Sequence, residues 1–340
     1  MNSDLEAVCV TGASGFVGYH LCARLVARGY QVHAAVRDPK DEVKVSPLKT
    51  LGVKLFGADL NEEHSFDEAL QGCQGLFHVA SSVRLHAKDP QRQIVDPAVQ
   101  GTLNVLRSAR KAGSIRRVVQ TSSIAAIVDN ELPLNTTFDE SVWNHSASLG
   151  REPYPLSKVL AERAALWFTE SLPKTERWVL TSLHPSFVLG PLHSKTHLRS
   201  SPVLVRQLLR GSLPAIPDLI FGFVDVRDVA EAHLRAYEHP SPSSRYLCSN
   251  VSVSLPELAS LLSELFPQSR VSTRTLPHIL TYLTPLVDKR FSFHFLRKNL
   301  GKRRTLSNQR IKEELDISFR DFKESLRDCG RSMYAAGWIT

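Results

Sequence analysis

The stretch TGASGFVG, residues 11–18, follows an apolar run and opens an amphipathic run at residues 16–28. This order predicts a strand, a glycine turn and a helix. Gly12 suits a tight turn in which a Cβ would clash, Gly15 lets the backbone approach a ligand, and Gly18 lets the helix pack closely on the sheet. The free N–H groups at such a helix start can bind a pyrophosphate. The stretch therefore indicates a dinucleotide site, although its G-x-x-G-x-x-G spacing differs from the common G-x-G-x-x-G fingerprint, and a turn without a ligand is the alternative.

The composition is that of a globular protein. The chain has 340 residues, 42% of them hydrophobic, which is enough for one large domain or two modest ones. No secretory signal and no stretch of membrane-spanning length is visible, so we expect a cytoplasmic protein without a membrane span. The five cysteines show no metal-ligand spacing, so we expect reduced thiols and no metal.

The net charge of +8 is concentrated late in the chain. A nucleic-acid surface would need a recognisable module beside it, and none accompanies these residues. A solvated basic face is therefore favoured, and we expect no nucleic-acid partner. The basic residues in question are Lys289, Arg290, Arg297, Lys298, Lys302, Arg303 and Arg304.

Strand and helix patterns alternate through the first half of the chain, which predicts an α/β fold with a doubly wound parallel sheet of the Rossmann type. After about residue 185 several prolines interrupt the alternation, so a smaller C-terminal α+β substrate domain is expected. We assign residues 1–185 to the nucleotide-binding domain, with 221–250 returning to it, and residues 186–220 and 251–340 to the substrate domain. The expected strands lie at residues 31–36, 53–56, 76–79, 117–120 and 178–183, and the expected helices near 66–70, 98–112 and 156–171.

The residue that closes the second strand faces the adenosine ribose in such a fold, and an acid there would bind the 2′-hydroxyl of NAD. Here the stretch is AAVRDP, and Arg37 ends the strand. A guanidinium can pair with a 2′-phosphate, so Arg37 favours NADP, and Lys44 can add a second charge. Asp38 follows directly and keeps NAD as the alternative. Asp59, after the third strand, can accept from the adenine amino group or can be a turn aspartate.

Tyr154 and Lys158 lie one helical turn apart in YPLSK, so both face the same side of a helix. An adjacent ammonium stabilises a phenolate and lowers the pKa of the tyrosine. The tyrosine can then protonate a carbonyl oxygen as hydride arrives at the carbon. Ser122 and Ser123, in the TSS that closes the fifth strand, are both available to hold that carbonyl. The alternative is a surface tyrosine and lysine with two capping serines.

These motifs stand in the order found in extended short-chain dehydrogenases/reductases, and the chain resembles that family, which has an NAD-dependent epimerase/dehydratase type of Rossmann fold. VRDP, FHVAS and HPSFVLGP are most similar to the dihydroflavonol reductase and cinnamoyl-CoA reductase branch. The resemblance covers roughly residues 7–250 and fades beyond them. The motifs are TGASGFVG, VRDP, ADL, FHVAS (77–81), RVVQTSS (117–123), YPLSK (154–158), HPSFVLGP (184–191) and FVDVRDVA (223–230).

The resemblance implies an NADPH-dependent reductase that converts a ketone or aldehyde to an alcohol. In the family mechanism the second serine of TSS is catalytic, so the catalytic set becomes Ser123, Tyr154 and Lys158. The expected substrate contacts are Ser82, Val83 and Ile124. The residues expected to bind the cofactor are Gly12, Ser14, Gly15, Phe16, Val17, Gly18, Arg37, Lys44, Asp59, Leu60, Val79, Ala80, Ser81, Tyr154, Lys158, Pro185, Ser186, Phe187 and Val188.

The sequence does not identify the substrate. The segment between Ser123 and Tyr154 does not match the flavonoid-specific pattern, and no motif demands a coenzyme A thioester. Within that segment Trp143, Asn144 and His145 can approach the pocket, and His145 is more simply a loop histidine. Two other interpretations of the same fold are a 3β-hydroxysteroid dehydrogenase or nucleotide-sugar epimerase activity, and a non-catalytic cofactor-binding regulator. We expect a small carbonyl compound as the partner and a monomer or homodimer.

Overall fold

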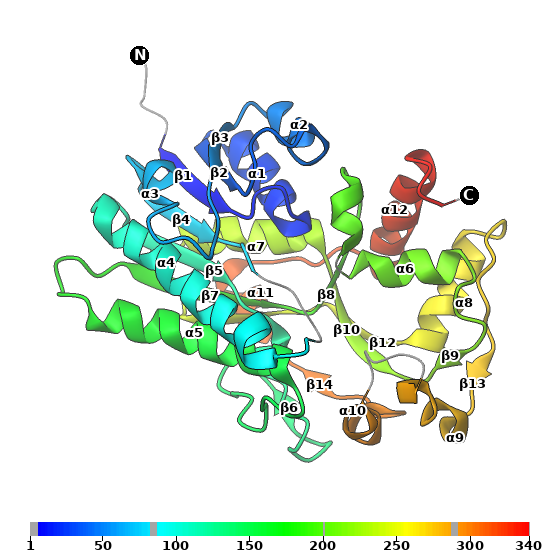
Figure 1. Ribbon diagram of the computed structural model, residues 1–340. Helices are drawn as coiled ribbons and strands as arrows, with labels where there is room; N and C mark the ends of the chain where they lie inside the picture. The colour runs from blue at the N-terminus through cyan, green and yellow to red at the C-terminus, as the bar shows by residue number, and fades with distance from the viewer. Residues whose placement is uncertain (1–5, 82–86, 200, 287–291, 340) are drawn as a thin grey trace.

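The computed structural model describes residues 6–81, 87–199, 201–286 and 292–339 (Figure 1). The expected substrate contacts Ser82 and Val83 lie outside the described residues, as do the basic residues Lys289 and Arg290.

A seven-stranded sheet is the centre of the fold, and every neighbouring pair of its strands is parallel. In spatial order the strands are β11 (Arg245–Cys248), β7 (Val179–Pro185), β5 (Arg117–Thr121), β4 (Gly75–His78), β1 (Ala7–Thr11), β2 (Gln31–Val36) and β3 (Lys54–Gly57). From β1 the chain builds outward through β2 and β3, and then returns to place β4 on the other side of β1. Ligands bind where the strand order of such a sheet reverses, which here is between the carboxyl ends of β1 and β4.

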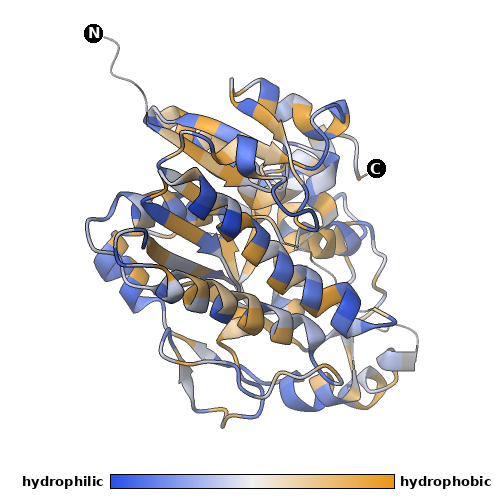
Figure 2. Cartoon of the chain, turned by 60° about the vertical axis from the view of Figure 1, so that its left-hand side comes forward, coloured by the Kyte–Doolittle hydropathy of each residue, from blue (hydrophilic) through white to orange (hydrophobic). Residues whose placement is uncertain are grey.

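Side-chain alternation along the strands gives the sheet two apolar faces. Val8 and Val10 of β1 pack in one cluster with α1 (Phe16–Arg28) and α7 (Val226–Glu238), whereas Cys9 packs in a second cluster with α4 (Asp96–Ala112) and α5 (Pro153–Ser171). Short α3 (Asp67–Leu70) joins the second cluster. Figure 2 shows hydrophilic and hydrophobic residues alternating along the helix ribbons, as expected of helices with one buried side.

A smaller unit is built on a three-stranded sheet of β12 (Val251–Ser254), β10 (Ile220–Asp225) and β8 (Phe187–Leu189). Beside it α6 (Pro202–Leu209), α8 (Leu255–Leu265) and α12 (Phe322–Ala335) pack against one another (Figure 1). Two short strand pairs are separate from both sheets: β9 (Ile216–Pro217) with β13 (Thr275–Leu276), and β6 (Thr137–Phe138) with β14 (Thr305–Leu306). The remaining helices are α2 (Glu42–Lys49), α9 (His278–Thr281), α10 (Phe293–Asn299) and α11 (Gln309–Leu315).

The predicted fold class, a doubly wound parallel sheet with flanking helices, is confirmed. Within the segment 221–250, α7 and β11 lie with the large sheet, whereas β10 pairs in the small one. The boundaries drawn between two domains stay a prediction. In the described part of the chain, none of the helices combines the length and the hydropathy that crossing a membrane requires.

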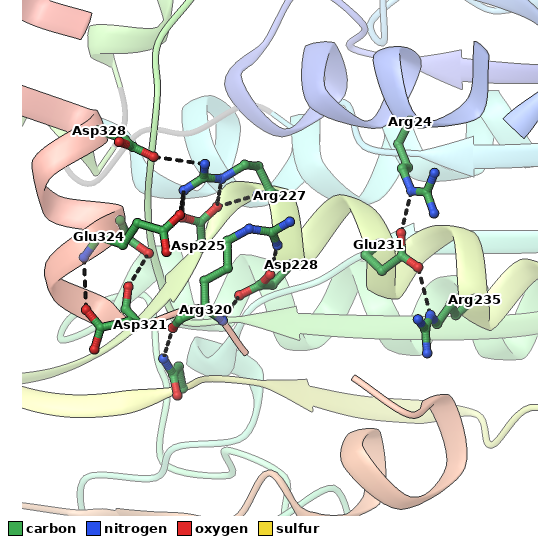
Figure 3. A network of polar contacts seen from close by, with 12 residues as sticks. Arg24, Asp225, Arg227, Asp228, Glu231, Arg235, Arg320, Asp321, Glu324 and Asp328 are labelled. Carbon is green, nitrogen blue, oxygen red and sulfur yellow. Dashed lines mark hydrogen bonds and ion pairs between the residues drawn. The ribbon is translucent and has the colours of Figure 1, made fainter. Parts of the chain in front are cut away.

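An ion-pair network joins α7 to α12 (Figure 3). Asp225 is buried and accepts from Arg227 Nε at 2.9 Å and from Nη2 at 2.7 Å. The same guanidinium reaches Asp328 of α12 at 2.9 Å. Burial raises the pKa of Asp225, but hydrogen bonds from Arg227 and Ser325 outweigh it and keep the pKa below its usual value. The carboxylate is therefore charged, and α12 is held by a partly buried pair.

We predict that Arg227→Met lowers the free energy of unfolding by about 2–3 kcal/mol, because the buried Asp225 would lose both of its charge-assisted bonds. The matched control is Arg24→Met, which breaks a less buried pair with Glu231 (Figure 3) and should cost about 0–1 kcal/mol, because Glu231 keeps its bond from Arg235. Urea unfolding measures both. Equal losses of unfolding free energy in the two variants would contradict a stabilising role of the buried Asp225–Arg227 pair.

Candidate active site

The glycine turn lies between β1 and α1, as predicted. Gly12 has a φ of +67°, and a Cβ on it would come within 2.8 Å of Ala80 Cα at the end of β4. Around Gly15 the only neighbour among the described residues that a Cβ would meet within 4 Å is the Gly12 carbonyl oxygen, at 3.1 Å. The first turn of α1 carries no acidic residue. An open, uncapped helix start beside two strand ends fits an anionic ligand.

Gly18 is needed for a different contact from the one expected. A Cβ there would lie 2.3 Å from the Gly12 carbonyl oxygen and 2.9 Å from Ala13 Cα. The close approach is therefore between α1 and the loop itself rather than between α1 and the sheet. The loop is also tied to β4, because Thr11 Oγ1 accepts from the Ala80 N–H at 3.1 Å.

At the adenosine end, Arg37 and Asp59 pair with each other. Arg37 Nε lies 3.2 Å from Asp59 Oδ2, and the Arg37 side chain is 83% exposed. Asp59 also accepts from the backbone of Asn61, as a turn aspartate does. Lys44, on α2, is bonded to Asp41. Both predicted cations at this end thus already have carboxylate partners, and Arg37 is the more accessible of the two to a phosphate.

The two serines after β5 have different environments. Ser122 is buried and its hydroxyl donates to Glu162 at 2.6 Å. Ser123 is half-buried, and its Oγ accepts from the Ala125 N–H at 3.2 Å, which caps the short 3-10 helix Ile124–Ala126. The motif alone left both serines available; in the structure the Ser122 hydroxyl is bonded to the interior, whereas Ser123 is the less buried of the two.

Tyr154 and Lys158 lie in the first turns of α5, whose start is favoured by Pro153 at its first position. Lys158 Nζ lies 5.7 Å from the centroid of the Tyr154 ring. Lys158 is buried, and its Nζ donates to Ser81 Oγ at 2.8 Å. Ser81 follows β4, so this bond brings the helix to the strand end that faces the glycine turn. The helix also contacts the 3-10 helix that Ser123 caps.

Several polar side chains line a small cavity next to Lys158. His78 is buried, with Nδ1 3.0 Å from Thr11 Oγ1 and Nε2 3.4 Å from Thr102 Oγ1. Burial, assisted by the charge of Lys158, lowers the pKa of His78 to about 4. The imidazole is therefore neutral at neutral pH. Gln120 and Glu162 also line the cavity.

Residues 185–188, which are expected to bind the cofactor, lie at the end of β7 and the start of β8. Pro185 ends β7 and Phe187 begins β8, so residues 185–188 cross from the large sheet to the small one. Ser186 donates its N–H to the Cys248 carbonyl at 3.0 Å. Its hydroxyl is buried and has no hydrogen-bond partner among the described residues. An orphaned hydroxyl at this place fits a polar ligand group.

The loop before α5 is held by polar contacts. Asn144 is buried and bonds the carbonyls of Ala125 and Ala126 at 3.1 and 2.9 Å. His145 is exposed, and its backbone N–H donates to Asp129 at 3.0 Å. The simpler interpretation of His145 as a loop histidine agrees with this position. Trp143 stacks under the Arg245 guanidinium at 3.9 Å.

Sequence reasoning missed the buried residues behind the site. Glu162 accepts from Ser122, from His184 Nε2 at 2.8 Å and from Arg245 Nε at 2.8 Å. One signal was visible: Glu162 continues the helical face of Tyr154 and Lys158 by one more turn.

Two of the late basic residues pair with acids of the same chain. Lys298 lies 2.5 Å from Glu131, and Arg303 lies 3.3 Å from Glu257. Arg304 instead donates to backbone carbonyls. The expectation of a solvated basic face stays a prediction.

A family model described as the NAD dependent epimerase/dehydratase family matches residues 8–248. The chain belongs to this family. The matched range runs from the second residue of β1 to the last residue of β11, so it spans the whole large sheet. Family membership thus covers the part of the chain in which the motifs were found.

Two curated relatives indicate the branch of the family to which the chain is similar. Cinnamoyl-CoA reductase CAD2 of Medicago truncatula is 40% identical over 77% of this chain and 81% of its own length. Dihydroflavonol 4-reductase of Gerbera hybrida is 35% identical over 89% of this chain and 86% of its own. The resemblance to the dihydroflavonol reductase and cinnamoyl-CoA reductase branch is confirmed.

Among solved structures, the yeast methylglyoxal/isovaleraldehyde reductase Gre2 complexed with NADPH is similar over 98% of this chain and 100% of its own. Its TM-score is 0.82 and its sequence identity 28%. The similarity extends beyond residue 250, where the sequence motifs fade.

We predict that His78 contributes to acid sensitivity of the fold. Its pKa is about 4 in the folded chain against the ordinary histidine value of 6.5, so between these values only the unfolded chain binds the proton. Stability is therefore lost as the pH falls from 6.5 towards 4. His78→Gln should make the slope of unfolding free energy against pH shallower, by up to about 1.4 kcal/mol per pH unit.

Urea unfolding at several pH values measures that slope. His145→Gln, which alters an exposed imidazole, is the control and should retain the wild-type slope. An unchanged slope in His78→Gln would exclude the buried imidazole as a contributor.

Proposed function

We propose that the chain reduces a ketone or aldehyde to an alcohol with NADPH, and that Tyr154 is the proton donor. The observation that carries the proposal is the bond from Lys158 to Ser81, at 2.8 Å. It brings the tyrosine-bearing helix to the crevice between β1 and β4, where the glycine turn opens.

The class of enzyme and its cofactor rest on the relatives. The chain is an NADP-dependent oxidoreductase, because its relatives carry the names of reductases and the yeast reductase of the same fold was crystallised with NADPH. The residues present fit that cofactor. Gly12 and Gly15 would hold the pyrophosphate at the start of α1, and the exposed Arg37 would hold the 2′-phosphate.

When bound, NADPH supplies a hydride to the carbonyl carbon of the substrate. The C=O double bond becomes a C–O single bond, and Tyr154 gives its phenolic proton to the oxygen. Lys158 stabilises the resulting phenolate by its charge and would hold the nicotinamide ribose. The Ser123 hydroxyl donates to the carbonyl oxygen and so favours the developing negative charge. The product is an alcohol, and the phenolate takes its proton back from solvent.

The substrate, the oligomeric state and the cellular location remain predictions. We expect a small carbonyl compound as substrate, a monomer or homodimer, and a cytoplasmic location. The division into a nucleotide-binding and a substrate domain and the individual cofactor contacts are part of the same proposal.

We predict that Tyr154→Phe lowers kcat at least about a hundredfold while NADPH still binds, because the variant lacks the proton donor but keeps the ring. The substrate is first chosen from a panel of ketones, aldehydes, flavanonols and acyl-CoA thioesters by following NADPH oxidation. NADPH binding is measured by fluorescence titration. Turnover equal to wild type in Tyr154→Phe would refute the mechanism.

We predict that Arg37→Asp shifts the preference from NADPH towards NADH, since a carboxylate repels the 2′-phosphate and accepts from the 2′-hydroxyl. The readout is the ratio of kcat/KM for the two cofactors. Lys44→Ala is the comparison, and it should change the ratio less because the Lys44 side chain is less exposed than that of Arg37. An unchanged ratio in Arg37→Asp would remove Arg37 from the phosphate site.

A further inference from the structure

Glu162 is a fully buried carboxylate on the same face of α5 as Tyr154 and Lys158. Its side chain has no exposed surface. It lines the small cavity next to Lys158, and its own hydrogen bonds run to the interior of the protein. A buried charge is costly unless it is paired, so its partners must be strong.

Three bonds meet at this carboxylate. Its Oε2 accepts from the Ser122 hydroxyl at 2.6 Å and from His184 Nε2 at 2.8 Å, and its Oε1 accepts from Arg245 Nε at 2.8 Å. Burial raises the pKa of Glu162, but His184, Arg245 and Ser122 outweigh it and bring the pKa down to about 2. The group is therefore an anion that links α5 to β5, β7 and β11.

One arm of this network ends beside the catalytic serine. The backbone N–H of Ser122 donates to the Leu183 carbonyl at 2.8 Å, which is the last ladder bond before Ser123. Beyond it, the chain turns into the 3-10 helix that Ser123 caps. The Ser122 side chain thus links the start of the turn to α5 by a hydrogen bond.

The other arm reaches the loop that follows that turn. Arg245 Nη1 donates to the carbonyls of Glu140 and Val142 at 2.7 and 2.9 Å, and its guanidinium stacks on Trp143. Asn144 then bonds back to the 3-10 helix. Both arms therefore converge on the turn that presents Ser123.

We propose that Glu162 is a positioning residue for carbonyl reduction, which acts through Ser122 to hold Ser123 against the helix that carries Tyr154 and Lys158. This inference rests on the proposed function. The chemistry needs hydroxyl and phenol to meet one oxygen atom, and misplacement by about 1 Å can cost about a hundredfold in rate. The 2.6 Å bond from Ser122 to Glu162 joins the end of β5 to α5. A short bond to a charged group restricts how far the two elements can move apart, and so keeps Ser123 in place relative to Tyr154.

The test compares Ser122→Ala and Glu162→Gln with Thr169→Val. Thr169 lies on the same helix and accepts a buried bond from Trp178 Nε1 at 3.0 Å, far along α5 from Tyr154. Its removal gives a matched loss of one buried bond without a link to Ser123. Steady-state kcat and KM, NADPH binding and the thermal midpoint are measured for each variant.

We expect Ser122→Ala and Glu162→Gln to lower kcat by about tenfold with KM and NADPH affinity within about twofold of wild type. Thr169→Val should keep the wild-type kcat. The decisive readout is a double-mutant cycle with Ser123→Ala: if Ser122 acts through Ser123, Ser122→Ala costs nothing further in that background.

A kcat for Ser122→Ala equal to that of Thr169→Val would overturn the inference. So would the same loss from Ser122→Ala whether or not Ser123 is present, because that pattern means general destabilisation. Failure of the proposed function has a different signature, in which Ser123→Ala and Tyr154→Phe themselves retain wild-type turnover.

Discussion

The backbones of Gly12 and Ala80 lie so close that a Cβ on Gly12 would come within 2.8 Å of Ala80 Cα. This contact joins the carboxyl ends of β1 and β4, between which the sheet reverses its direction of growth. The glycine turn is thereby held against the segment that follows β4, in which Ser81 accepts a bond from Lys158. One steric requirement thus holds the glycine turn close to the helix that carries Tyr154 and Lys158.

Behind the site, polar interactions replace apolar packing. Glu162 lies on α5, and His184 and Arg245 lie on strands of the large sheet; all three are buried. Their burial is tolerated because His184 and Arg245 each pair with Glu162. Such a network permits fewer alternative arrangements than a purely apolar contact, because donors and acceptors must match in direction as well as distance.

The central fold could be predicted from the sequence because local patterns decide it. Alternating strands and helices, the glycine spacing and the Tyr154–Lys158 turn are all short-range signals. What the sequence could not supply depends on distant pairings. Nothing near Glu162 indicates that Arg245 would be its partner, and only the fold shows that Asp59 faces Arg37. The resemblance assigned catalysis to Ser123, but only the fold shows that the Ser122 hydroxyl is bonded to Glu162 on a helix outside the motif.

The position of β11 at the edge of the large sheet has a consequence for how the protein folds. Arg245, which neutralises Glu162, lies on this strand, and the chain must first build β8, β10 and α7 before reaching it. A nascent chain that ends before residue 245 would bury Glu162 without the guanidinium, at a cost that opposes docking of α5. Docking of α5 is therefore disfavoured until β8, β10 and α7 have been synthesised and Arg245 has followed them.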